Sequence, residues 1–251
     1  MALLSDGNPN DTLALQAYET EILNVAAIEK IDLGAKLGLA TEEITEDVLN
    51  VLIDHAANAD ARRRIGVSDV VVTPQMKRWH AVHTLEIVYR DAFNNQLNDR
   101  YKAKVAEYHE LSRRARDNTF KFGIGTVLAP IPKAEIPALS TVAGPALGGT
   151  FYVAVSWVSA NGQQGAPSDV TAFSTVAGTL LAVTAVHAPA IAAGYNVYVG
   201  TSADSLALQN AAPVPAGGEF VLSGGLVDGP PPGSGQAPDL YTVGGSTMRR
   251  G

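Results

Sequence analysis

The longest uninterrupted pattern of apolar positions lies between residues 74 and 122, a stretch with no Gly and with Pro only at its first position. Apolar side chains recur there every three or four residues, which predicts one face of an α-helix. Thr73 and Pro74 predict its start, because Thr is a good N-cap and Pro fits the first helical position. Gly123 predicts its end. The predicted stripe contains Trp79, Val82, Leu85, Tyr89, Phe93, Leu97, Tyr101, Val105, Tyr108, Leu111 and Ala115.

One straight helix over this stretch would be roughly 70 Å long at about 1.5 Å per residue, which is too long for a small core to cover. Two interpretations are open. Either the helix breaks at the polar run over residues 94–99, or neighbouring copies of the chain share its apolar stripe. We favour the break, which predicts two helices packed as an αα unit.

Two further helices are predicted before this region. Residues 12–32 have helical spacing, and residues 41–59 begin with Thr41 and acids, which are typical of a first helical turn. Gly34 and Gly38 are expected to separate the two helices. The expected buried positions are Leu13, Tyr18, Ile22, Val25, Ala26 and Ile28 in the first helix and Val48, Leu49, Leu52, Ile53 and Ala56 in the second.

The apolar pattern changes to a period of two after residue 150, which predicts strands. Five or six short apolar runs are separated by Gly, Pro or Ser, and Asn161-Gly162 is typical of a turn. Such spacing predicts a small antiparallel sandwich. A first edge strand is expected around residues 131–142. The predicted strand segments are FYVAVSWVS, SDVTAFST, TLLAVTAV, YNVYVGT and EFVLS.

The sequence therefore predicts an α+β multidomain protein, in which an N-terminal helical bundle precedes a small antiparallel β-sandwich and an extended C-terminal tail. Residues 1–11 are polar and rich in turn formers, so we expect an arm there. The predicted divisions are a helical domain at 1–122, a linker at 123–149, a β-sandwich at 150–228 and a tail rich in Pro and Gly at 229–251.

Charge is divided unevenly along the chain. Residues 74–122 hold ten Lys and Arg against six Asp and Glu, a net charge of +4, whereas residues 1–73 carry a net charge of −8. A basic helical rod beside an acidic segment would let like subunits attract one another around a ring.

Composition excludes several classes of protein. Cys is absent, which excludes disulfides, zinc knuckles and thiol nucleophiles. The N-terminus lacks the basic and apolar regions of a secretory signal. The most apolar window, residues 179–193, is too short to span a bilayer, and the overall acidity argues against a protein that coats nucleic acid.

Candidate chemistry is sparse. His80, His83 and Glu86 are close enough on one helix to meet, but the zinc-protease signature requires two His four residues apart. We therefore interpret both His as polar positions at a subunit contact. No phosphate-binding Gly loop and no serine in a nucleophile elbow occurs. The sequence predicts a protein that is not an enzyme and that has no cofactor or metal.

Two groups of residues raise the possibility of nucleic-acid contact. The arginines at 62–64 could grip phosphate or complete the end of an acidic helix, and a charge run is usually a solvated surface. Tyr89, Tyr101 and Tyr108 lie among Lys and Arg and could stack on bases. Their helical spacing favours packing instead.

Two segments resemble parts of phage structural proteins. The run RWHAVHTLEIVYRDAFNNQLNDRYKAKVAEYHELSRRA resembles the helical core of head-to-tail connector, or adaptor, proteins of tailed bacteriophages. The run TFYVAVSWVSANGQQGAPSDVTAF, followed by AGYNVYVGTS, resembles the fibronectin type III or immunoglobulin-like modules of many virion proteins. The helical resemblance is carried by Trp79, Tyr89, Ala92, Arg100, Tyr101, Lys104 and Tyr108.

The resemblance implies a homo-oligomeric ring, usually twelvefold, in the virion neck, made in the host cytoplasm and placed between the portal protein and a tail or nozzle protein. Double-stranded DNA would pass through its channel without sequence-specific binding, and no membrane is implied. The expected oligomer or partner contacts are Trp79, Tyr89, Arg100, Tyr101, Lys104, Tyr108, Arg113, Arg114 and Arg116, and the expected portal-docking residues of the tail are Pro230, Pro231, Pro232, Leu240 and Tyr241.

Two other functions remain open. A tail, baseplate or fibre protein would use the β-module to bind a host glycan, which predicts exposed aromatic side chains around Trp157. A cytoplasmic DNA-binding regulator would use the helices, which predicts duplex binding that weakens as salt is added.

Overall fold

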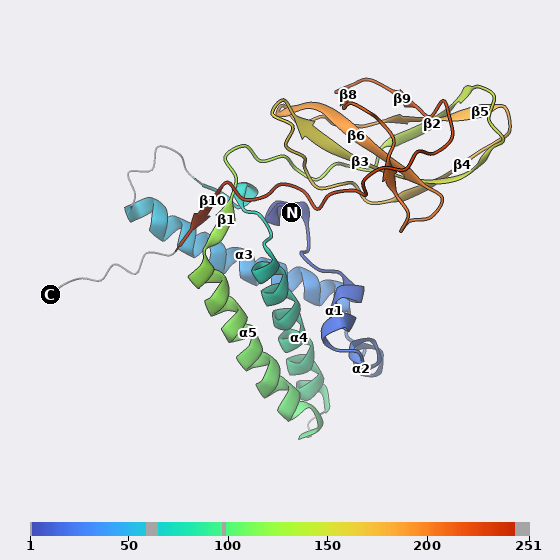
Figure 1. Ribbon diagram of the computed structural model, residues 1–251. Helices are drawn as coiled ribbons and strands as arrows, with labels where there is room; N and C mark the ends of the chain where they lie inside the picture. The colour runs from blue at the N-terminus through green and yellow to red at the C-terminus, as the bar shows by residue number, and fades with distance from the viewer. Residues whose placement is uncertain (1, 59–64, 97–98, 244–251) are drawn as a thin grey trace. The chain divides into compact units, whose positions relative to one another are not determined.

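The chain has a mixed α+β fold built from two compact units (Figure 1). We call them the helical unit and the β unit and describe each by itself. The computed structural model describes residues 2–58, 65–96 and 99–243. The helical unit contains residues 7–128 and 238–251, and the β unit contains residues 1–6 and 129–237.

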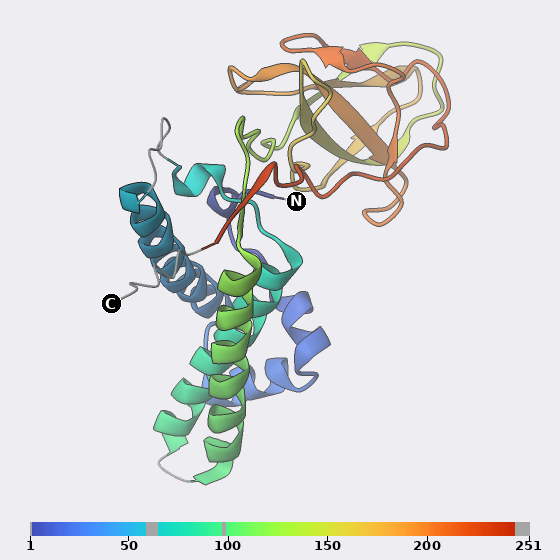
Figure 2. The same ribbon diagram turned by 60° about the vertical axis from the view of Figure 1, so that its left-hand side comes forward.

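In the helical unit α4 and α5 form an antiparallel hairpin, and α1, α2 and α3 each pack against α4 (Figure 2). Short 3-10 helices lie at Leu4–Asp6, in the β unit, and at Val67–Asp69 and Asp99–Tyr101. The helices are α1 at Thr12–Tyr18, α2 at Ile22–Glu29, α3 at Leu33–Asn58, α4 at Pro74–Gln96 and α5 at Lys102–Phe122.

The predicted break in the long helical stretch is confirmed. α4 ends at Gln96 and α5 begins at Lys102. The predicted ends are also correct: the backbone N–H of Met76 donates to Thr73 Oγ1 at 3.3 Å. Gly123 has a φ of 95° and donates its N–H to the Thr119 carbonyl at 3.1 Å. Residues Leu97 and Asn98, part of the predicted break, lie outside the described residues.

The expected interruption at Gly34 and Gly38 is wrong, because α3 runs through both glycines. Asp32 caps the helix, accepting from the backbone N–H of Ala35 at 3.1 Å. A glycine in a helix costs about 1 kcal/mol, and burial of the apolar residues on the same turns offsets that cost. These residues are Leu33, Leu37, Ala40 and Ile44.

The helix expected over residues 12–32 is divided at residues 19–21, where neither α1 nor α2 continues. Each short helix buries only a narrow edge, so part of the predicted apolar face is turned outward. Ile22 and Ala26 are buried as expected, but Leu13 is 72% exposed and Ile28 is 57% exposed. Tyr18 and Ile53, also expected to be buried, are exposed as well.

The predicted N-terminal arm is also corrected. Leu3 and Leu4 are buried rather than free. Asp6 anchors this segment in the β unit: its Oδ1 accepts from the backbone N–H of Lys133 at 3.0 Å, and its Oδ2 accepts from that of Leu3 at 2.8 Å.

The β unit consists of two antiparallel sheets, one with strand order β2-β5-β9 and the other with order β4-β3-β6-β7, in which β8 also pairs with β6. Gly162 has a φ of 77° in the predicted turn after β3. The expected first strand begins later than predicted, at residue 138. The strands are β2 at Ala138–Ala143, β3 at Gly149–Ser159, β4 at Thr171–Thr175, β5 at Thr179–Thr184, β6 at Ala192–Gly200, β7 at Ala207–Leu208, β8 at Val214–Pro215 and β9 at Phe220–Val221.

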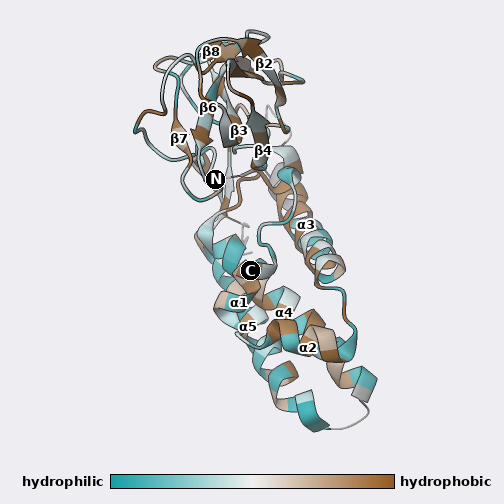
Figure 3. Ribbon diagram, turned by 90° about the vertical axis from the view of Figure 1, so that its right-hand side faces the viewer, coloured by the Kyte–Doolittle hydropathy of each residue, from teal (hydrophilic) through white to brown (hydrophobic). Residues whose placement is uncertain are grey.

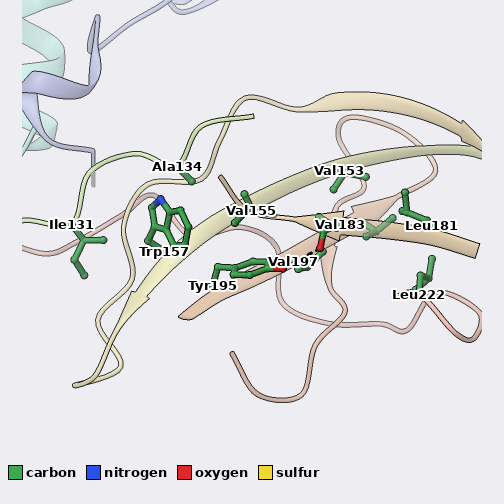
Figure 4. Packing of buried hydrophobic residues seen from close by; sticks show 12 residues of the cluster. Ile131, Ala134, Val153, Val155, Trp157, Leu181, Val183, Tyr195, Val197 and Leu222 are labelled. Carbon is green, nitrogen blue, oxygen red and sulfur yellow. Dashed lines mark hydrogen bonds between the residues drawn. The ribbon is translucent and has the colours of Figure 1, made fainter. Parts of the chain in front are cut away.

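Side chains of both sheets meet in one core around Trp157 and Tyr195 (Figure 4). The two rings meet edge to face, with centroids 5.9 Å apart. The Tyr195 hydroxyl lies next to the Val183 and Gly218 carbonyls, at 3.0 and 2.7 Å, so its polar end is satisfied inside the core. The core also contains Ile131, Ala134, Val153, Val155, Leu181, Val183, Ala185, Val197, Val199 and Leu222.

The described part of the C-terminal segment pairs within its own chain. Strand β1, at Ile124–Thr126, pairs with β10, at Leu240–Thr242, and we call this pair the terminal ribbon. Val70 forms an antiparallel bridge with Thr126 on the other side of β1. Residues 244–251 of the predicted tail lie outside the described residues.

Leu181→Ala tests the core of the β unit. Removing a buried leucine leaves a cavity, so we expect the free energy of unfolding of the β unit to fall by about 2–5 kcal/mol, as measured by urea unfolding of the full chain. Leu147→Ala is the matched control, because Leu147 is 96% exposed. Equal losses in both variants would contradict the assigned core.

Candidate functional site

The four aromatic residues expected at an oligomer contact lie inside the helical unit. Trp79 packs edge to face on Phe120 of α5 with ring centroids 5.5 Å apart. Tyr89 stacks on Tyr108 at 5.3 Å and contacts Tyr101 at 5.9 Å. Trp79, Tyr89, Tyr101 and Tyr108 are each at most 5% exposed. These rings join α4 to α5 within the chain, so a neighbouring copy would meet other side chains.

Two carboxylates, which the sequence did not single out, fasten α1 and α2 to this aromatic layer. Glu19 accepts hydrogen bonds from Lys104 Nζ at 2.6 Å and from the Tyr108 hydroxyl at 2.8 Å. Glu29 accepts from the Tyr101 hydroxyl at 2.9 Å. Burial by itself would raise the pKa of Glu19, but the hydrogen bonds from Lys104 and Tyr108 lower it below its usual value. Lys104, Tyr101 and Tyr108, which were expected at an oligomer contact, thus bind carboxylates of their own chain.

The predicted contact arginines also have partners within the chain. Arg113 and Arg114 share Glu110, at 2.9 and 2.6 Å, on the exposed surface of α5. Arg116 binds both carboxylate oxygens of Asp47, at 2.7 and 3.1 Å, and so connects α5 to α3. The remaining predicted cation, Arg100, lies over the Tyr101 ring at 5.1 Å.

His83 lies at the centre of a polar network among α3, α4 and α5. Its Nε2 is 2.7 Å from Glu43 Oε2. Its Nδ1 is 3.1 Å from Ser112 Oγ and 3.3 Å from Glu86 Oε2. His109 Nδ1 lies 2.8 Å from the other oxygen of Glu86. Burial would lower the pKa of His83, but its hydrogen bonds to Glu86 and Glu43 raise it above its usual value.

His80 is fully buried, so its predicted place at a subunit contact is wrong. Its Nδ1 lies 3.0 Å from Asn10 Nδ2, and its Nε2 lies 2.9 Å from Thr41 Oγ1 and 3.1 Å from the Leu37 carbonyl. Burial lowers the pKa of His80 to about 4, which makes it a neutral ring at pH 7. It joins the N-terminal segment and α3 to α4.

A pocket of about 340 Å³ opens beside His83, lined by acidic and polar side chains. No three His, Cys, Asp or Glu side chains among the described residues are grouped to hold a metal ion. No helix in the described part of the chain is long and apolar enough to cross a membrane. The lining residues are Glu43, Glu46, Asp47, Asn50, Trp79, His83, Ser112 and Arg116.

The residues expected to dock on a portal divide between the two units. The Leu208 backbone N–H donates to the Pro230 carbonyl at 3.0 Å, and Pro231 and Pro232 line a shallow pocket on the β unit. Leu240 and Tyr241 lie instead on β10 of the helical unit, and both are more than half exposed. Comparisons with protein-family profiles, with curated proteins and with solved structures find no match to the chain.

Glu19→Ala tests the attachment of α1 and α2. Hydrogen bonds to a charged group contribute about 1.5–3 kcal/mol, so we expect amide hydrogen exchange in α1 and α2 to be at least about tenfold faster in the variant. The control is Glu21→Ala, because the exposed Glu21 side chain bonds only to Asn24 among the residues that the structure describes. Unchanged exchange in Glu19→Ala would contradict the assigned role.

His83 predicts a dependence of stability on pH. Because its pKa is raised in the folded chain, protonated His83 stabilises the fold below about pH 6.5, and this contribution is lost as the pH rises through the raised pKa. We expect a thermal midpoint about 2–4 °C lower at pH 9 than at pH 6, measured by circular dichroism, and a smaller difference in His83→Gln. An equal difference in both proteins would contradict the prediction.

Proposed function

We propose that this chain is a structural protein of the virion neck in a tailed bacteriophage, a ring adaptor between the portal and the tail. DNA would pass through the ring without sequence-specific binding. The resemblance of residues 74–122 to connector proteins, stated above, supports this function. The helical unit would form the wall of the ring and the β unit a module attached to it.

The observation that carries the proposal is the separation of charge within the helical unit. Residues 11–32, which contain α1 and α2, hold five Asp and Glu against one Lys, a net charge of −4. α5 holds six Lys and Arg against three Asp and Glu, a net charge of +3. Glu19, Glu29 and Lys104 are bonded inside the unit, so the exposed charges are fewer. They include Asp11, Glu21 and Asp32 on one side and Arg113, Arg114 and Lys121 on α5. Exposed groups of opposite charge on different sides favour head-to-tail association, which closes into a ring when the rotation between subunits allows it.

The terminal ribbon supports a docking role for the C-terminal segment. Among the described residues β10 pairs only with β1, so its other edge leaves backbone groups for an added strand. Phe122 at the end of α5 is 62% exposed, and Leu240, Tyr241 and Val243 are also exposed. Gly123 lies against Tyr241 and Val243, so these two side chains lie beside the end of α5. We propose this apolar edge as the portal contact.

The glycan-binding alternative has less support. It predicts exposed aromatic side chains around Trp157, but Trp157 and Tyr195 are at most 2% exposed and form the core of the β unit. An aromatic platform for a sugar would have to lie elsewhere.

Native mass spectrometry tests the proposed function. We expect the full chain, alone or mixed with the portal ring of the same particle, to form one large closed ring. A dimer or trimer that ignores the portal would overturn the proposal and favour a regulator or a fibre protein. In the same experiment Leu240→Ser/Tyr241→Ser should form rings that no longer bind the portal, whereas the exposed control Leu147→Ser should still bind it.

A further inference from the structure

α2 is apolar on its exposed side as well as on its buried side, where Ile22 and Ala26 lie. Six of its eight residues are apolar, and Figure 3 shows much of it in brown. Its last residue, Glu29, is 7% exposed and accepts a hydrogen bond from Tyr101. Ile28, next to it, is exposed, as is Leu23. A helix that is apolar on nearly all sides is normally covered on all sides, so the outer face of α2 lacks the cover that its composition predicts.

The exposed apolar residues of α1 and α2 form what we call the α1–α2 surface. They are set among uncompensated acids. Asp11, Glu21 and Asp32 are exposed, and none has a cation partner in the part of the chain that the structure describes. The surface therefore combines apolar side chains with negative charge. Its apolar members are Leu13, Tyr18, Leu23, Ala27 and Ile28.

The outer face of α5 has the complementary properties. At about 100° per residue, Arg113, Arg114 and Lys121 point roughly 120–140° away from Tyr108, which faces α1 and α2. All three cations are exposed. Arg113 and Arg114 both bind Glu110, and Arg113 also lies 3.5 Å from an Asp117 carboxylate oxygen. Small exposed residues on this face, Ala103 and Ala106, leave room for bulky apolar side chains.

We propose that the α1–α2 surface docks on the outer face of α5 in a second copy of this chain. The inference rests on the proposed ring and names its subunit contact. Leu23 and Ile28 would pack over the alanines, and Glu21 would meet Arg113 and Arg114. Because the two surfaces lie on different sides of the helical unit, the contact is head-to-tail and can continue from copy to copy. Burial of apolar area would supply most of the affinity, and charge would select the partner face.

The first test compares Ile28→Ser with Ile53→Ser. Both replace an exposed isoleucine of a helix in the helical unit, at 57% and 61% exposure, but only Ile28 lies on the α1–α2 surface. We expect the concentration of half-assembly to rise at least about tenfold in Ile28→Ser, measured by native mass spectrometry and light scattering of the full chain. Ile53→Ser should assemble as the unchanged protein does. Circular dichroism checks that both variants remain folded.

A charge exchange tests the partner face. Glu21→Arg makes the α1–α2 surface basic at its rim, and Arg113→Glu/Arg114→Glu makes the α5 face acidic. Each variant alone should assemble at least about tenfold more weakly. An equimolar mixture should regain assembly, because alternating copies again present opposite charges to each other.

The results separate this inference from the proposed function. Rings that form normally in Ile28→Ser, or a mixture that regains no assembly, would overturn the α1–α2 contact and leave the ring proposal standing. An unchanged protein that forms only a dimer or trimer, lost in Ile28→Ser, would support the contact and overturn the ring. An unchanged protein that is monomeric up to about 100 μM, including with the portal, would overturn both.

Discussion

The packing of α4 on α5 through aromatic rings is the contact on which the rest of the helical unit depends. Tyr89 and Tyr108 stack in parallel, and Trp79 meets Phe120 at the other end of the hairpin. The helices α1, α2 and α3 bury apolar residues of their own, and polar contacts also connect α2 and α3 to this pair. The hydroxyls of Tyr101 and Tyr108 hold α2 and the segment before it through Glu29 and Glu19. The aromatic residues therefore provide the apolar contact between α4 and α5 and also the hydroxyl groups that donate hydrogen bonds to Glu19 and Glu29.

α3 is attached in a similar way between Leu37 and Asp47. His80 bonds to Leu37 and Thr41, His83 to Glu43, and Arg116 to Asp47. The buried His80 is neutral at pH 7, whereas His83 lies between two carboxylates that raise its pKa above the usual value. The pKa values of the two rings shift in opposite directions because their partners differ. His80 bonds to the uncharged Asn10, Thr41 and Leu37 carbonyl, whereas His83 bonds to the carboxylates of Glu43 and Glu86.

The helical unit buries the carboxylate of Glu29 while the apolar side chains of Leu23 and Ile28 lie on its surface. Glu29 at the end of α2 is a buried carboxylate in a position that an apolar side chain would fill in an ordinary bundle. The displaced apolar residues, Ile28 above all, face outward. A soluble chain rarely exposes several bulky apolar side chains together without a partner. The bonds of Glu19 and Glu29 inside the unit thus leave Leu23 and Ile28 of α2 exposed, and we propose this outer face as a contact with a second copy of the chain.

The sequence by itself determined the features that depend on local chemistry. Thr73, Pro74 and Gly123 set the ends of the hairpin, residues 94–99 predicted its break, and the change from a helical period to a period of two separated helices from strands. These features depend on the backbone preferences and capping groups of residues that are close together in the sequence, so they need no contact with distant residues.

Only the tertiary structure decided which side of each element is buried and what its polar atoms bind. Gly34 and Gly38 lie inside α3 because packing on α4 outweighs their low helix propensity. Tyr89 and Tyr108 are interior, Glu19 finds Lys104 from 85 residues away, and β10 returns to pair with β1. Periodicity predicts that a helix has an apolar face, but it cannot identify the partner of that face, because the partner is distant in the chain.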